Sequence, residues 1–235
     1  MSYLDAGSGQ IVANAAESER AAFIKRTYLH LGGAIAVFAI IETLLIKSGV
    51  AVSFMAMLSG SKWSWLIVLA AFMGISMLAN SWAHNGLSRE KQYMGLALYT
   101  LAEAVIFMPL IYMAQARADD VLLHASVITV ALVAGLTFTA FSTKINFSFM
   151  GRFLMIGGFV AMGVIVAAMI FGFSLGLWFS GAMILFAAAS VLYSTSNIIH
   201  EYHTDQHVAA SLSLFSSVGL LFWYVLQFMM GFGDD

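Results

Sequence analysis

The chain has 235 residues, of which 61% are hydrophobic and only 9% are charged, with a net charge of −2 and no cysteine. A soluble domain carries about 25% charged residues, so this chain cannot form the polar surface of a soluble protein. The lack of cysteine excludes disulfide scaffolds and thiolate chemistry. The lack of a basic excess argues against nucleic-acid binding. The composition therefore predicts an all-α polytopic membrane protein that is surrounded by a lipid bilayer.

A membrane-spanning helix needs about 20 apolar residues, and the sequence holds seven such runs. We place them at about residues 27–52, 63–82, 93–114, 121–141, 149–170, 177–199 and 208–230. No Lys or Arg flanks the last run, so a re-entrant hairpin is an alternative there. Residues 1–22 are interpreted as a flexible polar cytoplasmic tail, and residues 23–235 as one transmembrane domain.

The distribution of basic residues predicts the orientation, because cytoplasmic loops are enriched in Lys and Arg. The tail and every second loop would share one side, and this side carries Arg20, Lys25, Arg26, Arg89, Lys91, Lys144 and Arg152. The opposite side carries only Lys47, Lys62 and Arg117. We therefore expect a cytoplasmic N-terminus, and with seven spans an external C-terminus.

Two acidic residues fall inside the apolar runs. Glu103 lies near the middle of the third run, six residues before Pro109, the single proline of the chain. A charge at bilayer depth costs at least about 2.5–3.5 kcal/mol, so Glu103 is a candidate for binding an ion or a proton. The alternative is a protonated side chain that is hydrogen-bonded to a neighbouring helix. Glu42 is a second candidate, which we expect to lie near the outer end of the first helix, beside Lys47 and within reach of water.

Hydroxyl and amide side chains follow one face of each of the last two helices. Ser190, Ser194 and Asn197 recur at helical spacing in the sixth run, and Ser213 and Ser217 recur in the seventh, with Ser216 beside them. A short link joins these helices, so the two faces should meet. They predict either close helix packing or a polar pocket that lines an ion path.

The link between the last two helices is rich in histidine. His200, His203 and His207 could share a helix face and bind a divalent metal ion. The order His200-Glu201-Tyr202-His203 differs from the H-E-x-x-H pattern of metalloproteases. The alternative is a solvated loop that titrates near neutral pH. We expect no bound metal, because no second group that would orient the imidazoles is evident.

Four stretches give the chain a family resemblance. They are Phe23–Tyr28, Phe141–Gly151, Leu192–His200 and Ala210–Phe215. In these stretches the sequence resembles the Bax inhibitor-1 family, also called the transmembrane Bax inhibitor motif family, and especially its bacterial YccA-like branch. The resemblance covers about residues 22–230.

The resemblance implies a seven-helix fold in which the other six helices surround the last one. It implies a pH-sensitive calcium leak in some members, and in others restraint of cell death or binding to a membrane-anchored AAA protease. Members with the leak carry two pH-sensing aspartates at the positions of Ser194 and Ser217. Both positions are serine here, so this pair cannot share a proton. The second helix also lacks the buried arginine that could hold such a pair.

These observations predict a non-enzymatic protein of a bacterial inner membrane that needs no cofactor. No Walker loop, dinucleotide fingerprint or catalytic triad is evident. The leading hypothesis is an ion-leak or ion-homeostasis role in stress regulation, for calcium or protons, with any acid function at Glu103. The second hypothesis is a regulatory partner of a membrane AAA protease or another membrane complex, which would use the exposed tail.

Overall fold

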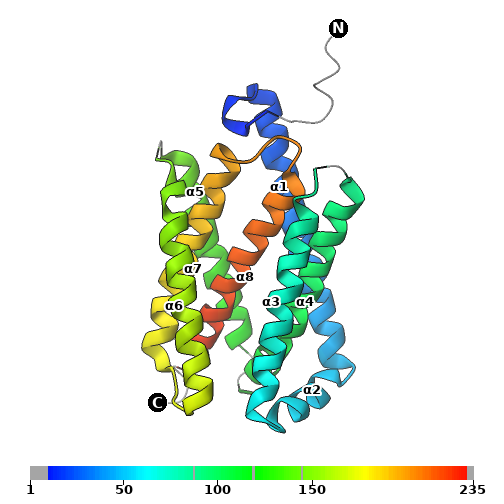
Figure 1. Ribbon diagram of the computed structural model, residues 1–235, viewed down its shortest axis with the longest axis vertical. Coiled ribbons are helices and arrows are strands. Elements are labelled where there is room, and N and C mark those ends of the chain that lie inside the picture. Colours follow the sequence, from blue (N-terminus) through cyan, green and yellow to red (C-terminus); the bar gives the residue numbers. More distant parts are fainter. Residues whose placement is uncertain (1–9, 87, 118–119, 144, 232–235) are drawn as a thin grey trace.

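The computed structural model describes residues 10–86, 88–117, 120–143 and 145–231. The elements in chain order are η1 (Val12–Asn14), α1 (Glu17–Lys47), α2 (Val50–Ser59), α3 (Lys62–Ala83), α4 (Arg89–Arg117), α5 (Val121–Ser142), η2 (Phe147–Phe149), α6 (Met150–Phe171), α7 (Gly176–His200) and α8 (His207–Gly231). Seven of these described helices are long and apolar enough to cross a membrane. The N- and C-terminal ends of the bundle lie at opposite ends of its long axis (Figure 1). The prediction of an all-α polytopic membrane protein is confirmed.

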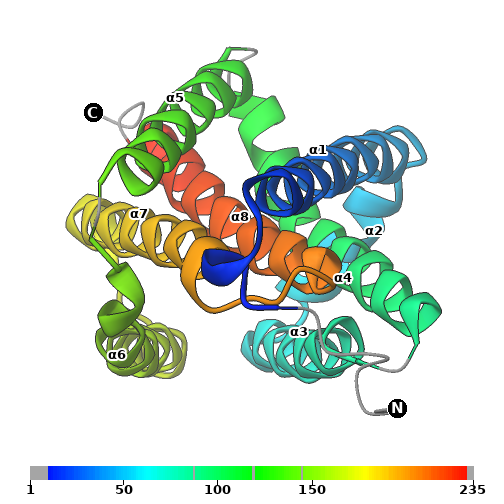
Figure 2. The ribbon, with the colours of Figure 1, turned by 90° about the horizontal axis from the view of Figure 1, so that it is seen from above.

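Helices α4 and α8 form the interior of the bundle. Buried residues make up 67% of the most apolar stretch of α4 and 61% of that of α8, against 11–22% in the other five spans. Seen along its axis, α8 crosses the centre of the bundle (Figure 2). The last helix is thus central, as the resemblance implied, and α4 shares the centre with it. Because α8 is one continuous helix over residues 207–231, the re-entrant hairpin is wrong.

The first apolar run contains a break that sequence analysis missed. It was expected to form one helix to residue 52, but α1 ends at Lys47 and a separate short helix, α2, follows. Gly49 lies between them with a φ of +78°, a left-handed conformation that costs glycine little. A basic residue in the last turn with a glycine just beyond it, here Lys47 and Gly49, is an ordinary end signal for a helix. The apolar residues on both sides of this signal led us to expect one continuous helix. Helix α2 lies at the end of the bundle away from the N-terminus (Figure 1).

The N-terminal segment is not a free tail as far as residue 22. Helix α1 already begins at Glu17, and Val12 in the short helix η1 is fully buried. The Val12 amide donates to the Tyr202 carbonyl oxygen at 2.9 Å, and Ile11 forms an antiparallel bridge with His203. Burial raises the pKa of Tyr202 above its ordinary value. Residues 10–16 therefore dock on the α7–α8 link, while residues 1–9 of the predicted tail lie outside the described residues.

Candidate functional site

The two acids of the apolar runs are both buried within the bundle. Only 3% of Glu103 on α4 and 4% of Glu42 on α1 is exposed. Both carboxyl oxygens of Glu42, and Oε2 of Glu103, have no hydrogen-bond partner among the described residues. A buried polar group without a partner is costly, and a buried carboxylate without a countercharge is more costly still. Such groups cluster at ligand and ion sites in membrane proteins.

The expectation that Glu42 reaches water is wrong, although Glu42 does lie near the end of α1. We expected it beside Lys47 at the outer end of the first helix, within reach of water. Lys47 comes five residues later in the sequence, which places it about 140° further round the helix. Glu42 consequently faces the interior of the bundle, and its carboxyl group is buried without Lys47 as a partner.

The Glu103 carboxyl group fits against the backbone of α8 at Gly219. A Cβ atom built at Gly219 would overlap Oε1 of Glu103. Glycine is therefore the one residue type that leaves room for this carboxyl group in its present position. Gly219 contributes to the site by having no side chain, and sequence analysis did not identify it. The signal was a lone glycine inside an otherwise helical apolar run.

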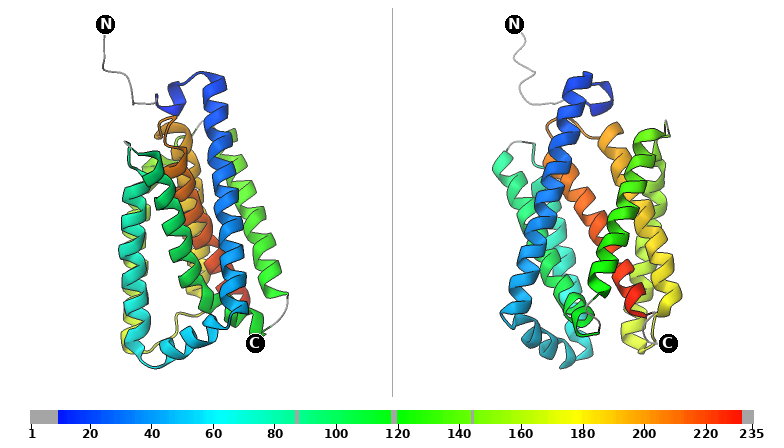
Figure 3. Two further views of the ribbon diagram at one scale, coloured as in Figure 1. Left: turned by 90° about the vertical axis from the view of Figure 1, so that its right-hand side faces the viewer. Right: turned by 180° about the vertical axis from the view of Figure 1, so that it is seen from behind.

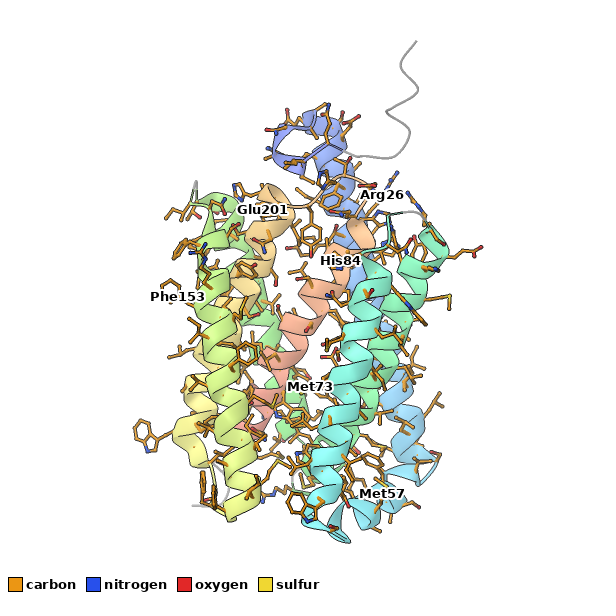
Figure 4. The ribbon with its side chains drawn as sticks, viewed as in Figure 1. Arg26, Met57, Met73, His84, Phe153 and Glu201 are labelled. Carbon is orange, nitrogen blue, oxygen red and sulfur yellow. The ribbon has the colours of Figure 1, made fainter. Side chains whose placement is uncertain are left out.

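Glu103 lies between two cavities. The larger, of about 860 Å³, is bounded by α3 and α6 and extends along α8; Met73 of α3 lies beside it (Figure 4). The smaller, of about 290 Å³, lies among α1, α4, α5 and α8, and Glu42 lines it as well. Among the described residues, only Glu103 and Phe107 line both cavities. Glu103 and Phe107 therefore mark the boundary between the two cavities.

Aromatic rings surround the boundary between the cavities. Phe107 lies one turn after Glu103 and contacts Phe38 and Trp223 edge-on, with ring centroids 5.3 and 4.9 Å apart, and stacks on Phe222 at 5.9 Å. Rings in such arrangements pack tightly and exclude water. A continuous path past Glu103 would therefore require Phe107 to move.

The predicted meeting of the hydroxyl faces of the last two helices is present. The Ser217 hydroxyl on α8 lies 2.8 Å from that of Ser194 and 3.1 Å from that of Ser190, both on α7. Ser213 donates to Ser194 at 3.3 Å, and Ser217 donates to the Ser213 carbonyl oxygen at 3.1 Å. The two positions at which the family resemblance places an acidic pair are thus in direct contact here, as hydroxyl groups.

Asn197 does not belong to this hydroxyl cluster. Its side-chain oxygen accepts a hydrogen bond from Ser148 at 2.8 Å, and Ser196 on the same turn accepts one from the Phe147 amide at 2.9 Å. Both contacts hold the η2 segment, which precedes α6, against the end of α7. Helical spacing placed Asn197 near the serine face, but its side chain has a structural partner outside that face.

The structure does not bring the three link histidines together. His200 points back to the Ser196 carbonyl oxygen at 2.9 Å, and His203 forms the backbone bridge with the N-terminal segment described above. His207 is buried at the start of α8, with its ring centroid 5.0 Å from that of His30 on α1. Among the described residues, no group of three His, Asp or Glu side chains has an arrangement that could hold a metal ion.

The fold and the buried acids define the class, a polytopic helical membrane protein with ionisable groups inside the bundle. Residues 20–234 match the sequence profile of the family described as inhibitor of apoptosis-promoting Bax1. The chain therefore belongs to the Bax inhibitor-1 family, which confirms the resemblance drawn from the four sequence stretches.

Relatives occur in bacteria and in yeast. An uncharacterised protein of Pseudomonas aeruginosa is 30% identical over 173 residues, which cover 72% of this chain and 76% of that protein. An uncharacterised protein of Neisseria meningitidis is 26% identical over 183 residues, covering 75% and 78%. A Schizosaccharomyces pombe protein named Bax inhibitor 1 is 26% identical over 223 residues, covering 93% and 79%. No solved structure matches the chain.

Proposed function

We propose that this member of the Bax inhibitor-1 family is a non-enzymatic ion-leak protein that helps a bacterium to maintain its ion balance under stress, with calcium or protons as the ion. Glu103 is the group that contacts the ion. The observation that carries the proposal is the position of Glu103, a buried acid that lines both cavities of the bundle. A group that can be reached from two sides is what a leak requires, with Phe107 as the barrier between them.

The decisive experiment measures ion flux into liposomes that contain the purified protein, with calcium- and proton-sensitive dyes. Glu103→Gln keeps the size and polarity of the side chain and removes its charge, so we expect the flux to fall at least tenfold. The matched control is Glu90→Gln, which removes an exposed acid at the start of the same helix and should leave the flux unchanged. A wild-type protein without flux at any pH from 5 to 8 would refute the leak.

The same assay tests which group senses pH. Serines at positions 194 and 217 carry no charge to titrate, so any pH response of the flux should come from a buried acid, and we assign it to Glu103 rather than to Glu42, because Glu103 lines both cavities. We expect a response that is weak in Glu103→Gln between about pH 6 and 8. Strong gating that persists in this variant would place the sensor elsewhere, and the link histidines would be the next candidates.

For the orientation we propose the inner membrane of a bacterium, with the N-terminus in the cytoplasm. The support is the excess of basic residues on the N-terminal side of the chain and the bacterial relatives. Reporter fusions to each end should report opposite sides, cytoplasmic for the N-terminus. Two cytoplasmic ends would contradict an odd number of spans.

The second candidate function is regulation of a membrane-anchored AAA protease or another membrane complex. It is favoured by the first turns of α1, which project beyond the neighbouring helices (Figure 1) and expose Glu17, Glu19 and Arg20. Cross-linking in native membranes followed by purification separates the two candidates. A stoichiometric protein partner that is lost when these three residues are replaced by alanine would favour regulation.

A further inference from the structure

The smaller cavity is larger than a single ion requires. Its volume of about 290 Å³ lies near the lower end of the range for small-molecule pockets, about 300–1,000 Å³, and far exceeds the size of a single ion. Four aromatic rings line it, those of Phe38, Phe107, Phe215 and Phe222. Such walls suit an apolar organic molecule.

The two acids of this cavity have no positive partner in the protein. Glu42 and Glu103 both line it with carboxyl oxygens that lack a hydrogen-bond partner. Among its described lining residues none is Lys, Arg or His. In their ionised form the two acids have no countercharge from the protein, so a ligand that brings a positive charge stabilises that form.

The hydroxyl groups of the cavity also favour a ligand that donates hydrogen bonds. Thr43 and Thr129 donate to the Ala39 and Ala125 carbonyl oxygens of their own helices, at 2.8 and 2.7 Å. Ser126 does the same toward Leu122 at 2.7 Å.

With their protons used in this way, these side chains present only oxygen lone pairs to the cavity. An ammonium group has three donors and no acceptor, which complements these hydroxyl acceptors and the two acids; Gln115, which also lines the cavity, can offer its side-chain oxygen as a further acceptor. Aromatic faces also attract cations within about 6 Å of the ring centroid.

The cavity reaches the outer surface of the bundle at α1 and α5, a surface that would face lipid in a membrane. Ile35 on α1 and Val130 on α5 line it and are 40% and 68% exposed. Seen from behind, α8 passes across the space between these two helices (Figure 3). A ligand that partitions into lipid can therefore enter from the side.

From this geometry we propose that the cavity is a binding site for an apolar primary amine, whose ammonium group lies between Glu42 and Glu103 and whose hydrocarbon body packs on the phenylalanine rings. This site goes beyond the proposed leak, because binding does not require that any ion crosses the protein. Flux and binding are measured separately, so either proposal can fail without the other.

The test uses 2-phenylethylamine, which is protonated at neutral pH as a lysine amine is. Calorimetric titration of the detergent-solubilised protein should show binding of the amine and at least tenfold weaker binding of 2-phenylethanol, its uncharged counterpart. Glu42→Gln and Glu103→Gln should each weaken amine binding at least tenfold. Glu90→Gln, which neutralises an exposed acid, should leave it unchanged.

A steric variant tests the site independently, in case the charge variants fail to fold. Ala39 lines the cavity from an exposed position on α1, and Ala39→Phe should obstruct the mouth and abolish amine binding without removing a charge.

Equal binding of the alcohol and the amine would overturn the proposal in favour of an apolar pocket. Binding that survives in all three cavity variants would place the amine elsewhere. Calcium binding that is lost in Glu42→Gln, with no amine binding, would overturn it in favour of an inorganic cation site.

Discussion

The interior of the bundle contains two polar centres that differ in how their groups are satisfied. Between α7 and α8, four serines form a connected network in which each hydroxyl group has a partner. Between α1 and α4, two carboxyl groups line one cavity, and three of their four oxygens lack a hydrogen-bond partner among the described residues. We call the four serines the serine centre, which resembles ordinary helix packing. We call Glu42 and Glu103 the carboxyl centre, which resembles a binding site.

The two centres differ in whether their groups can change charge. A hydroxyl network holds its helices together by weak contacts, about 0.6 kcal/mol each in membrane proteins, and carries the same charge at any physiological pH. A carboxyl group can exchange a proton for a cation. In this chain the acids lie on α1 and α4, away from the α7–α8 contact at which the family resemblance places an aspartate pair.

The largest effect should follow from filling the space that the carboxyl centre occupies. In Gly219→Ala the new methyl group overlaps the Glu103 carboxyl group, and overpacking of this kind costs about 1–3 kcal/mol. Thermal unfolding in detergent measures the loss. The matched control is Gly163→Ala on α6, where a Cβ has no neighbour within 4 Å and stability should change little.

A double variant sharpens this prediction. Adding Glu103→Ala to Gly219→Ala removes the overlapping group, so the two substitutions should cost less together than the sum of their separate effects. Strict additivity would mean that the carboxyl group does not contact α8 at this position.

The second effect comes from converting the serine centre into a carboxyl centre. In the double variant Ser194→Asp/Ser217→Asp, two acids replace hydroxyl groups that lie 2.8 Å apart. At low pH they can share a proton, whereas at higher pH both ionise and repel each other. The melting temperature should therefore fall as the pH rises from 5 to 8.

We expect a loss of roughly 1 kcal/mol, or about 2–4 °C for a chain of this size. The single variant Ser194→Asp is the control, because it has one acid and no repelling partner. An identical pH profile in the single and double variants would show that the two positions do not interact.

The smallest effect should come from trimming the serine network. Ser217→Ala removes contacts to Ser190 and Ser194, and each is worth about 0.6 kcal/mol. The expected destabilisation of about 1 kcal/mol or less should be the same at pH 5 and pH 8, because no charge is involved. A marked pH dependence of this loss would indicate that the network is coupled to the carboxyl centre.

Much of the architecture could be predicted from the sequence because membrane-spanning helices must be long and apolar. Seven spans, the central last helix and the contact between the faces of Ser194 and Ser217 follow from periodicity, short links and the family resemblance. The burial of Glu103 followed from its place in the middle of an apolar run.

Three features could not be predicted because they depend on how the helices are rotated and packed. Glu42 was expected at a wet helix end, but rotation of α1 turns it inward to the cavity that Glu103 also lines. Gly219 matters only because a carboxyl group from α4 lies against it. Asn197 shares a helix with the serines, yet η2, an element that has no apolar periodicity of its own, provides its partner.

The central place of α8 has a consequence for how the chain is made. In chain order α8 follows the other six spans, so these six are synthesised before the helix that fills the middle of the bundle. Until then the backbone of α8 is absent beside Glu103, and the serines of α7 have no hydroxyl groups to meet. The docking of residues 10–16 on the α7–α8 link likewise has to wait until that link has been synthesised. An early part of the polypeptide therefore joins a part that is made much later, and a nascent chain that stops before residue 207 would leave Glu103 and the α7 serines without α8 beside them.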